Sequence, residues 1–282
     1  MKRLTTIVIG LVFLSVYTIH ALDVVEEEVR IPMEQKSVFG TKTINLSGSI
    51  YKPNVDGKFP LVVLNHGTSR NPEERKNKIE MGDQSKVFVK KGFIVIVAMR
   101  RGYGDSEGVW VESIGKCNDP DYDSAAKEAV KDIKAVVEYM KRNPYTDTTR
   151  ILMVGQSTGG FSSLAYASVY SKELTGVINF AGGKGSMKPY EVCDPKRLIV
   201  TMGNFGKKVK IPTLWIYTEK DDFFPPTLSQ KMFKAYQQEG GMGKLHMLTS
   251  EQTPYGHNFF YKGIATWDPL IDEFLREIHL LK

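Results

Sequence analysis

Apolar runs bounded by turn-forming residues recur along the chain and predict a parallel sheet. Each core run is nearly free of polar residues, so the strand that it predicts has both faces buried. Parallel sheets covered by helices on both sides produce this pattern, whereas a sheet with one face in water produces alternation. The core runs are residues 61–64, 93–99, 151–155, 176–183 and 211–219, followed by a weaker strand pattern at 244–251.

Two segments before the first core run alternate polar and apolar residues instead. Within residues 42–51, Thr43 and Asn45 fall on the face opposite to Ile44 and Leu46, and residues 24–32 also alternate. Alternation with a period of two predicts half-buried strands, and two such strands in succession predict an antiparallel hairpin. We expect this N-terminal hairpin at the edge of the sheet.

Helical periodicity fills the segments between the core runs. It is clearest in residues 122–142, where apolar residues at steps of three and four form one helix face: Ala126, Val130, Ile133, Val137 and Met140. Strands that alternate with helices predict a doubly wound α/β sheet, and residues 22–282 contain no repeat or long linker that would divide them. Further helical segments are expected at 72–91, 161–171, 226–239 and 267–281.

The first 21 residues differ in composition from the rest of the chain. Lys2 and Arg3 precede an uncharged stretch from 4 to 22, and Ala21 is a small residue suited to a cleavage site. This order is typical of a secretory signal peptide, so we expect a periplasmic or secreted protein whose mature chain is not inserted in a membrane. An uncleaved anchor is the alternative, since about 20 apolar residues can span a bilayer.

Charge and cysteine content narrow the possible partners. The formal net charge is +6, and removal of Lys2 and Arg3 leaves 36 basic against 32 acidic residues, a mild excess of +4. No dense basic run is present, which argues against nucleic acid as a partner. Cys117 and Cys193 form no C-x-x-C pattern, so no metal site is expected. In an exported protein their even number favours a disulfide, with two buried thiols as the alternative.

One serine stands between glycines where a predicted strand gives way to a predicted helix. In Gly155-Gln156-Ser157-Thr158-Gly159 the glycines lie two positions on either side of Ser157 and leave room for a tight turn. This G-x-S-x-G pattern indicates a nucleophile elbow, which exposes the serine hydroxyl above the sheet. A glycine-rich turn whose serine caps the helix is the alternative, so other residues must supply the chemistry.

A nucleophilic serine needs a base, and the base needs an acid that orients it. Of the five histidines, His257 lies in a glycine-containing loop after the last strand, at the edge where the elbow opens. Glu219, Asp221 and Asp222 follow an apolar strand between the serine and this histidine. The order serine, acid, histidine is the one that accompanies such an elbow, and Asp221 and Asp222 are both candidates on spacing alone.

Acyl transfer also needs donors for the negative oxygen that forms at the carbonyl. The backbone N–H of Thr158 opens the helix after the serine, where the helix dipole favours negative charge. The loop NHGT after the first core strand offers a second donor, for which Thr68 N–H is the candidate.

Together these motifs resemble the α/β hydrolases, most of all the dienelactone-hydrolase-like and prolyl-oligopeptidase-like serine hydrolases. The resemblance covers nearly all of residues 22–282 and rests on NHGT, RRGYGDSEG, GQSTGG, PTLWIYTEKDD and YGHNFF. It implies the α/β-hydrolase fold with a small lid only, and it favours Asp221 as the acid. Dienelactone hydrolase itself has cysteine where this chain has Ser157, and the propeller of prolyl oligopeptidases has no counterpart in this sequence.

The expected activity is hydrolysis of a small carboxylic ester through an acyl-enzyme on Ser157, without a cofactor. The glycines of RRGYGDSEG and AGGKGS do not match the spacing of nucleotide-binding loops. Peptide or amide cleavage is one alternative, and a catalytically silent binding protein on the same fold is another. A Cys117–Cys193 disulfide would tie the loop after RRGYGDSEG to the short cover that follows Gly182.

Overall fold

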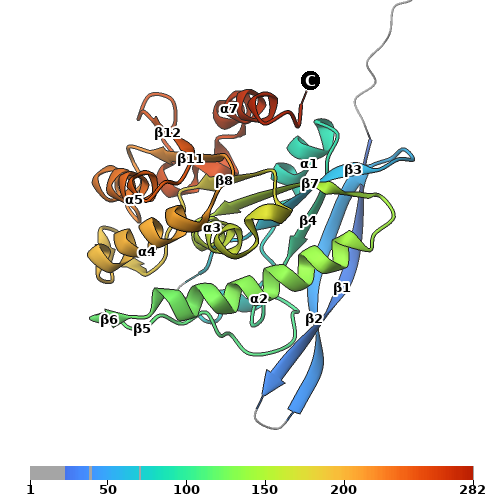
Figure 1. Ribbon diagram of the computed structural model, residues 1–282, viewed down its shortest axis with the longest axis horizontal. Coiled ribbons are helices and arrows are strands. Elements are labelled where there is room, and N and C mark those ends of the chain that lie inside the picture. Colours follow the sequence, from blue (N-terminus) through green and yellow to red (C-terminus); the bar gives the residue numbers. More distant parts are fainter. Residues whose placement is uncertain (1–22, 38–39, 70, 282) are drawn as a thin grey trace, which may run out of the picture.

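A computed structural model describes residues 23–37, 40–69 and 71–281; the predicted leader at 1–21 lies outside these ranges. Its centre is an eight-stranded sheet in the order β1-β2-β4-β3-β7-β8-β11-β12 (Figure 1). In this order the last six strands (β4, β3, β7, β8, β11 and β12) run parallel, while β2 is antiparallel to both β1 and β4. The sheet strands are β1 (Val24–Ser37), β2 (Gly40–Pro53), β3 (Phe59–Asn65), β4 (Ile94–Ala98), β7 (Thr146–Gln156), β8 (Gly176–Phe180), β11 (Thr213–Thr218) and β12 (Gly243–Leu248).

The N-terminal hairpin is confirmed and is longer than the alternation predicts. Its two strands pair without interruption from Val24 with Pro53 to Ser37 with Gly40. Only the part of β2 from Gly48 to Tyr51 pairs with β4, so the far end of the hairpin extends beyond the sheet (Figure 1). The pairing holds because the apolar side chains of one face, such as that of Leu46, are buried.

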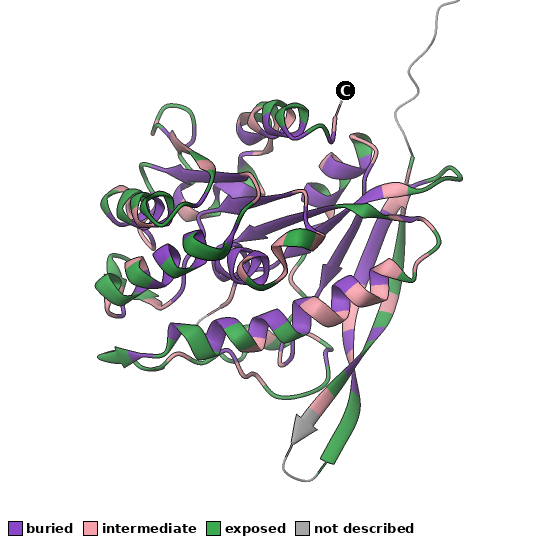
Figure 2. Cartoon of the chain, viewed as in Figure 1, coloured by how far each residue is buried: buried purple, intermediate pink, exposed green. Residues whose placement is uncertain are grey.

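The core strands are buried where the continuous apolar runs predict, and in β7 this is the part from Ile151 to Gln156. Every residue of β4, β8 and β11 is buried, and the purple centre of Figure 2 shows this layer between the helices. Because these strands are parallel, their carboxyl ends meet at one edge, and the loops that follow them are brought together there.

Helices cover both faces of the sheet (Figure 1). α1 and α7 lie on one face, where Phe88 stacks on Trp267, and α2, α3 and α4 lie on the other, with α5 packed against α4. In the described part of the chain, no helix combines the length and apolarity needed to cross a bilayer. The helices are α1 (Gly82–Lys90), α2 (Tyr122–Lys141), α3 (Thr158–Tyr170), α4 (Pro195–Lys208), α5 (Pro226–Gln238), α6 (Phe259–Lys262) and α7 (Ile264–Glu277), with short 3₁₀ turns η1 (Glu74–Lys76), η2 (Ser171–Glu173) and η3 (Gly256–Asn258).

Two helical segments differ from the sequence prediction. Residues 72–91 do not form one helix but the short 3₁₀ turn η1 and the separate helix α1. η1 buries none of its residues, whereas α1 packs on the sheet through Phe88 and Val89. The last helix begins at Ile264 rather than 267 and ends before His279, whose positive φ of 58° breaks the helical conformation.

The short cover expected between Gly182 and residue 211 contains α4, which the prediction missed. The Asp194 carboxylate caps this helix by accepting the N–H of Arg197, and Pro195 occupies its first turn. Only the residues before α4 are left to form a small lid. This lid contains the hairpin β9 (Ser186–Lys188) and β10 (Glu191–Val192), and a second small hairpin, β5 (Gly115–Lys116) and β6 (Asp119–Pro120), belongs to the loop after β4.

Candidate active site

Ser157 occupies the turn between β7 and α3, as the G-x-S-x-G pattern predicts. Its backbone adopts φ 57° and ψ −123°, a strained conformation for a residue other than glycine. The two glycines are needed because the turn is so tight: a Cβ at Gly155 would collide with the Gly159 backbone, and one at Gly159 with the carbonyl of Asn65. The turn therefore presents Ser157 at the carboxyl edge of the sheet.

Loop 181–185 after β8 holds Ser157 from one side. The Ser157 N–H donates to the carbonyl of Phe180 at 2.9 Å, and the Gly183 N–H donates to the Ser157 carbonyl at 3.1 Å. On the other side the loop after β3 passes directly against the serine, because a Cβ at Gly67 would lie 3.2 Å from the Ser157 Cβ. The position of Ser157 is thus fixed by three strand ends.

Asp221 and His257 are brought together from loops 36 residues apart. The His257 Nδ1 lies 3.0 Å from the Asp221 Oδ2 and 3.1 Å from the Oδ1. The Asp221 carboxylate is buried and also accepts the backbone N–H groups of Phe223 and Phe224, both at 2.9 Å. These bonds fix the carboxylate, so it can hold the imidazole in one orientation.

The neighbouring carboxylate takes no part in this pair. Asp222 contributes its backbone carbonyl, which accepts the N–H of Tyr190 from the lid at 2.6 Å. The structure therefore pairs Asp221 with the histidine, as the family resemblance implies. His257 lies beside the elbow, because the Gln156 side chain donates to the His257 carbonyl at 3.4 Å.

Thr68 and Thr158, the candidates for the oxyanion hole, lie next to each other. Their hydroxyl oxygens are 2.6 Å apart, and the Thr68 hydroxyl also lies 2.7 Å from that of Tyr103. The indole N–H of Trp110 donates to the Tyr103 hydroxyl at 3.1 Å. Burial raises the pKa of the Tyr103 phenol to about 12, so the phenol stays a neutral hydrogen-bonding group at pH 7. This hydroxyl chain joins the loop after β3 to the start of α3.

A buried charge cluster beneath these loops was missed by the sequence analysis. Arg100, Glu112 and Lys184 are each at most 4% exposed. The Glu112 carboxylate accepts from the Arg100 Nε, lies 3.5 Å from the Arg100 Nη2, and lies 3.3 Å from the Lys184 Nζ. Burial opposes the charge on Glu112, but the two cations outweigh it and hold its pKa at about 2. Glu112 thus joins the loop after β4 to the loop after β8.

His66 links this cluster to the Ser157 loop. Its Nε2 accepts the Arg100 backbone N–H at 3.1 Å, so the proton sits on Nδ1, which donates to the Gly67 carbonyl at 2.7 Å. The Arg100 guanidinium also donates to the His66 carbonyl at 3.0 Å. Complete burial, together with the Arg100 charge, lowers the pKa of His66 to about 3. It is a neutral structural histidine at pH 7.

Cys117 and Cys193 form a disulfide, as their even number predicts. The bridge joins the turn between β5 and β6 to the residue after β10, so it ties the loop after β4 to the lid. Arg197 reinforces the same junction through its ion pair with Asp119 at 2.6 Å. The Tyr122 hydroxyl donates to the carbonyl of Cys193. Both loops that meet at the disulfide also carry members of the buried charge cluster.

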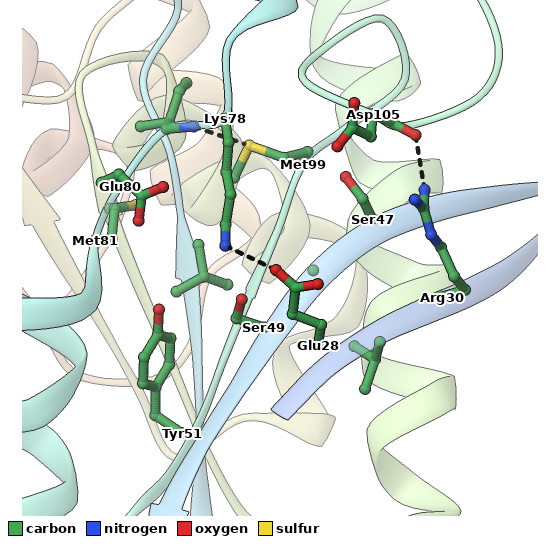
Figure 3. A pocket seen from close by; sticks show the side chains of 14 residues that line it. Glu28, Arg30, Ser47, Ser49, Tyr51, Lys78, Glu80, Met81, Met99 and Asp105 are labelled. Carbon is green, nitrogen blue, oxygen red and sulfur yellow. Dashed lines mark hydrogen bonds and ion pairs between the residues drawn. The ribbon is translucent and has the colours of Figure 1, made fainter. Parts of the chain in front are cut away.

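A cavity of about 280 Å³ lies elsewhere, between the hairpin, β4 and residues 78–81 (Figure 3). Lys78 points across it to Glu28 at 3.5 Å, and Arg30 donates to the Asp105 carbonyl at 2.9 Å. None of the candidate catalytic residues lines this cavity. Among the described residues, no three His, Cys, Asp or Glu side chains gather as metal ligands would.

Two proteins of known name are similar to part of the chain. The quorum-quenching protein AidA of Acinetobacter baumannii is 26% identical over 130 residues, which are 46% of this chain and 38% of that protein. Dipeptidyl-peptidase 5 of Porphyromonas gingivalis is 33% identical over 97 residues, which are 34% of this chain and 13% of that protein. The matches thus span well under half of either relative.

Solved structures share the fold over most of the chain. The esterase Pf2001 of Pyrococcus furiosus superposes with a TM-score of 0.62 at 16% identity, covering 89% of this chain and 90% of that one. A putative dienelactone hydrolase of Klebsiella pneumoniae superposes with a TM-score of 0.60 at 16% identity, covering 88% and 97%. The α/β-hydrolase fold expected from the sequence is confirmed.

The model of one protein family matches residues 42–193, a range that contains Ser157 and the loops on either side of it. That family is described as X-Pro dipeptidyl-peptidase (S15 family). The matched residues make up more than half of the chain and include the strands from β3 to β8. The chain belongs to this S15 family and has the α/β-hydrolase fold.

Proposed function

We propose that the protein is an exported esterase that cleaves carboxylic esters through an acyl-enzyme on Ser157. One observation carries the proposal: His257 Nδ1 is paired with a buried carboxylate, Asp221, at 3.0 Å. The pair lies at the sheet edge where the elbow presents Ser157. A histidine held in this way keeps Nε2 free to accept a proton, which is what a serine nucleophile requires.

The catalytic cycle follows from these positions. His257 Nε2 accepts the Ser157 hydroxyl proton as Oγ attacks the ester carbonyl, and Asp221 stabilises the imidazolium that forms. The backbone N–H groups of Thr158 and Thr68 hold the oxyanion of the tetrahedral intermediate. The intermediate collapses, and the alcohol leaves with the proton from His257. Water, activated by the same histidine, then releases the acid from Ser157.

Esters and peptides require the same triad but differ in the leaving group. The peptidase description of the family and the peptidase name of the Porphyromonas relative support peptide cleavage as the second candidate. The esterase and the putative dienelactone hydrolase among the structural neighbours support esters. An alcohol leaves more readily than an amine, so ester hydrolysis makes the smaller demand on the acid role of His257.

Comparison of matched substrates tests this choice. We expect kcat/KM for p-nitrophenyl butyrate to exceed that for the p-nitroanilide of the same acid by more than the ratio of their uncatalysed rates. A spectrophotometric assay measures both, because p-nitrophenol and p-nitroaniline are both coloured, and the identical acyl group leaves the leaving group as the only difference. Faster cleavage of X-Pro anilides than of any ester would replace the proposal with the peptidase function.

Export is supported by the leader pattern of residues 1–21 and by the Cys117–Cys193 disulfide, since disulfides persist in oxidising compartments. When the 282-residue chain is expressed in a bacterium, we expect the intact mass of the exported protein to match that of a chain that starts at residue 22. Recovery of the uncleaved chain in the membrane fraction would show that the leader is an anchor.

A further inference from the structure

Tyr190 in the lid has a conformation and an exposure that folding alone does not explain. It lies in the turn between β9 and β10 with φ 60°, in the left-handed region that disfavours large side chains. Its side chain is 77% exposed, the largest value among the exposed large hydrophobic residues of the described chain. A glycine or asparagine would fit this turn at lower energy, and no burial of the ring compensates.

The backbone of Tyr190 is fixed close to the catalytic pair. Its N–H donates at 2.6 Å to the Asp222 carbonyl, which belongs to the peptide that joins Asp222 to Phe223. The Phe223 ring in turn lies 4.7 Å, between centroids, from the ring of His257. The lid is also held at Cys193 by the disulfide. The backbone of Tyr190 is therefore held next to the loop that carries Asp221 and Phe223, and its aromatic ring is open to solvent.

Strained backbone is concentrated in the same region. Five described residues other than glycine have positive φ, and four of them belong to the elbow or to residues 181–194: Ser157, Ala181, Tyr190 and Asp194. Such strain persists where the surrounding structure enforces it, and it gathers at functional sites.

Exposed apolar side chains also occur on several of the loops that follow the sheet strands. Tyr255 lies two residues before His257, Met187 shares the lid hairpin with Tyr190, and Val109 precedes Trp110, which bonds to Tyr103. Tyr190 is the most exposed of them, and an exposed apolar side chain next to a candidate site is available to contact a ligand.

We propose that Tyr190 and Phe223 form the binding surface for an aromatic group of the substrate, so that aryl-bearing esters are the preferred class. This inference rests on the proposed function and names its substrate. Aromatic rings favour aromatic partners in edge-to-face or offset stacks, and Tyr190 offers an open ring for such a stack. The bond from the Tyr190 N–H to the Asp222 carbonyl anchors the Tyr190 backbone to the loop whose Phe223 ring packs on His257.

Replacement of Tyr190 by glycine tests the assignment, because we expect it to maintain or raise the melting temperature while it lowers kcat/KM for aryl-bearing esters. Y190G relieves the positive φ, so its melting temperature is expected to equal or exceed that of the wild type. Its kcat/KM for benzyl acetate or ethyl phenylacetate is expected to fall about tenfold through KM, as is usual for a lost apolar contact. For ethyl acetate, which lacks a ring, kcat/KM is expected to stay within about twofold, as for an interaction that the substrate cannot make.

Two control variants separate the ring from other effects. Y190F keeps the ring and is expected to retain the wild-type preference. Val200→Ala shortens another exposed apolar side chain, on α4, and is expected to change neither stability nor preference. Equal losses of Y190G on benzyl acetate and ethyl acetate, or no loss on either, would overturn the assignment while leaving the esterase function in place.

A binding measurement makes the inference independent of turnover. In the Ser157→Ala background, calorimetric titration with benzyl acetate reads the contact directly, and the addition of Y190G is expected to weaken the affinity about tenfold, as in the kinetic test. If the wild-type protein hydrolyses no ester, the esterase proposal fails, but this titration still decides the role of Tyr190. Equal affinities with and without the ring would overturn it.

Discussion

Ser157→Ala is expected to lower ester hydrolysis by about 10⁴-fold or more, the loss typical of a triad nucleophile. Without Oγ no acyl-enzyme can form, and only binding and the oxyanion donors remain to accelerate attack by water. The fold should be unaffected, because the backbone bonds of Ser157 to Phe180 and Gly183 do not involve its side chain. Hydrolysis of p-nitrophenyl butyrate measures the loss, and melting temperature reports the fold.

A serine on the helix that follows the elbow provides the matched control. Ser168 in α3 uses its hydroxyl to donate to the Ala165 carbonyl at 2.7 Å, away from the elbow. Ser168→Ala is expected to keep activity within about twofold, since it touches no candidate catalytic group. A fluorophosphonate probe should label the wild type and Ser168→Ala on Ser157 alone. Undiminished hydrolysis by Ser157→Ala, or failure of the probe to label the wild type, would favour the silent binding protein.

The parts of the site with a local sequence signature could be predicted. The glycines around Ser157 mark a tight turn, and the five residues of the G-x-S-x-G pattern are enough to predict it. The loop position of His257 and the carboxylates after β11 follow from the rule that parallel strands end at one edge. The selection of Asp221 over Asp222 depends on the turn after β11, which the spacing alone did not specify.

The charge cluster could not be predicted, because its members are brought together by the tertiary fold. Glu112 lies 72 residues before Lys184, and neither belongs to a sequence motif that predicts a buried ion pair. A weak signal was present, since Arg100 follows an apolar strand directly, where a charged side chain needs a partner. The helix α4, which the prediction missed, had a clearer sequence signal, because Asp194 followed by Pro195 is typical of a helix start.

This cluster ties together the loops after β3, β4 and β8, two of which pack against Ser157. Arg100 bonds to the His66 carbonyl next to Gly67, and Lys184 directly follows the glycine that bonds to Ser157. Charges at this depth cost several kcal/mol each to remove from water, so each depends on its partners. Glu112 is the common partner, and its loss leaves two cations buried together.

Glu112→Gln is accordingly expected to lower the free energy of unfolding by about 3–5 kcal/mol, the usual cost of a broken buried ion pair. The shift of the Glu112 pKa from 4.5 to about 2 corresponds to about 3 kcal/mol, which agrees with that range. Urea unfolding at pH 7 measures the loss. Glu138→Gln, which breaks half-exposed pairs with Lys134 and Lys141 on the helix α2, is expected to cost about 1 kcal/mol or less.

The pH dependence separates the charge of Glu112 from its packing. Because its pKa is lower in the folded state, the carboxylate contributes stability above pH 4.5 that is lost as the pH falls toward 2. The difference between wild type and Glu112→Gln should therefore stay constant from pH 8 to about 6 and shrink below about 4.5. Between pH 6.5 and about 4 His66 destabilises both proteins to nearly the same extent, because its folded pKa of about 3 lies below this range and the loss of Glu112, which raises that pKa, only lowers it further. A difference that persists unchanged to pH 3 would mean that the side chain stabilises the loops through its shape and hydrogen bonds, and the electrostatic account of the cluster would fail.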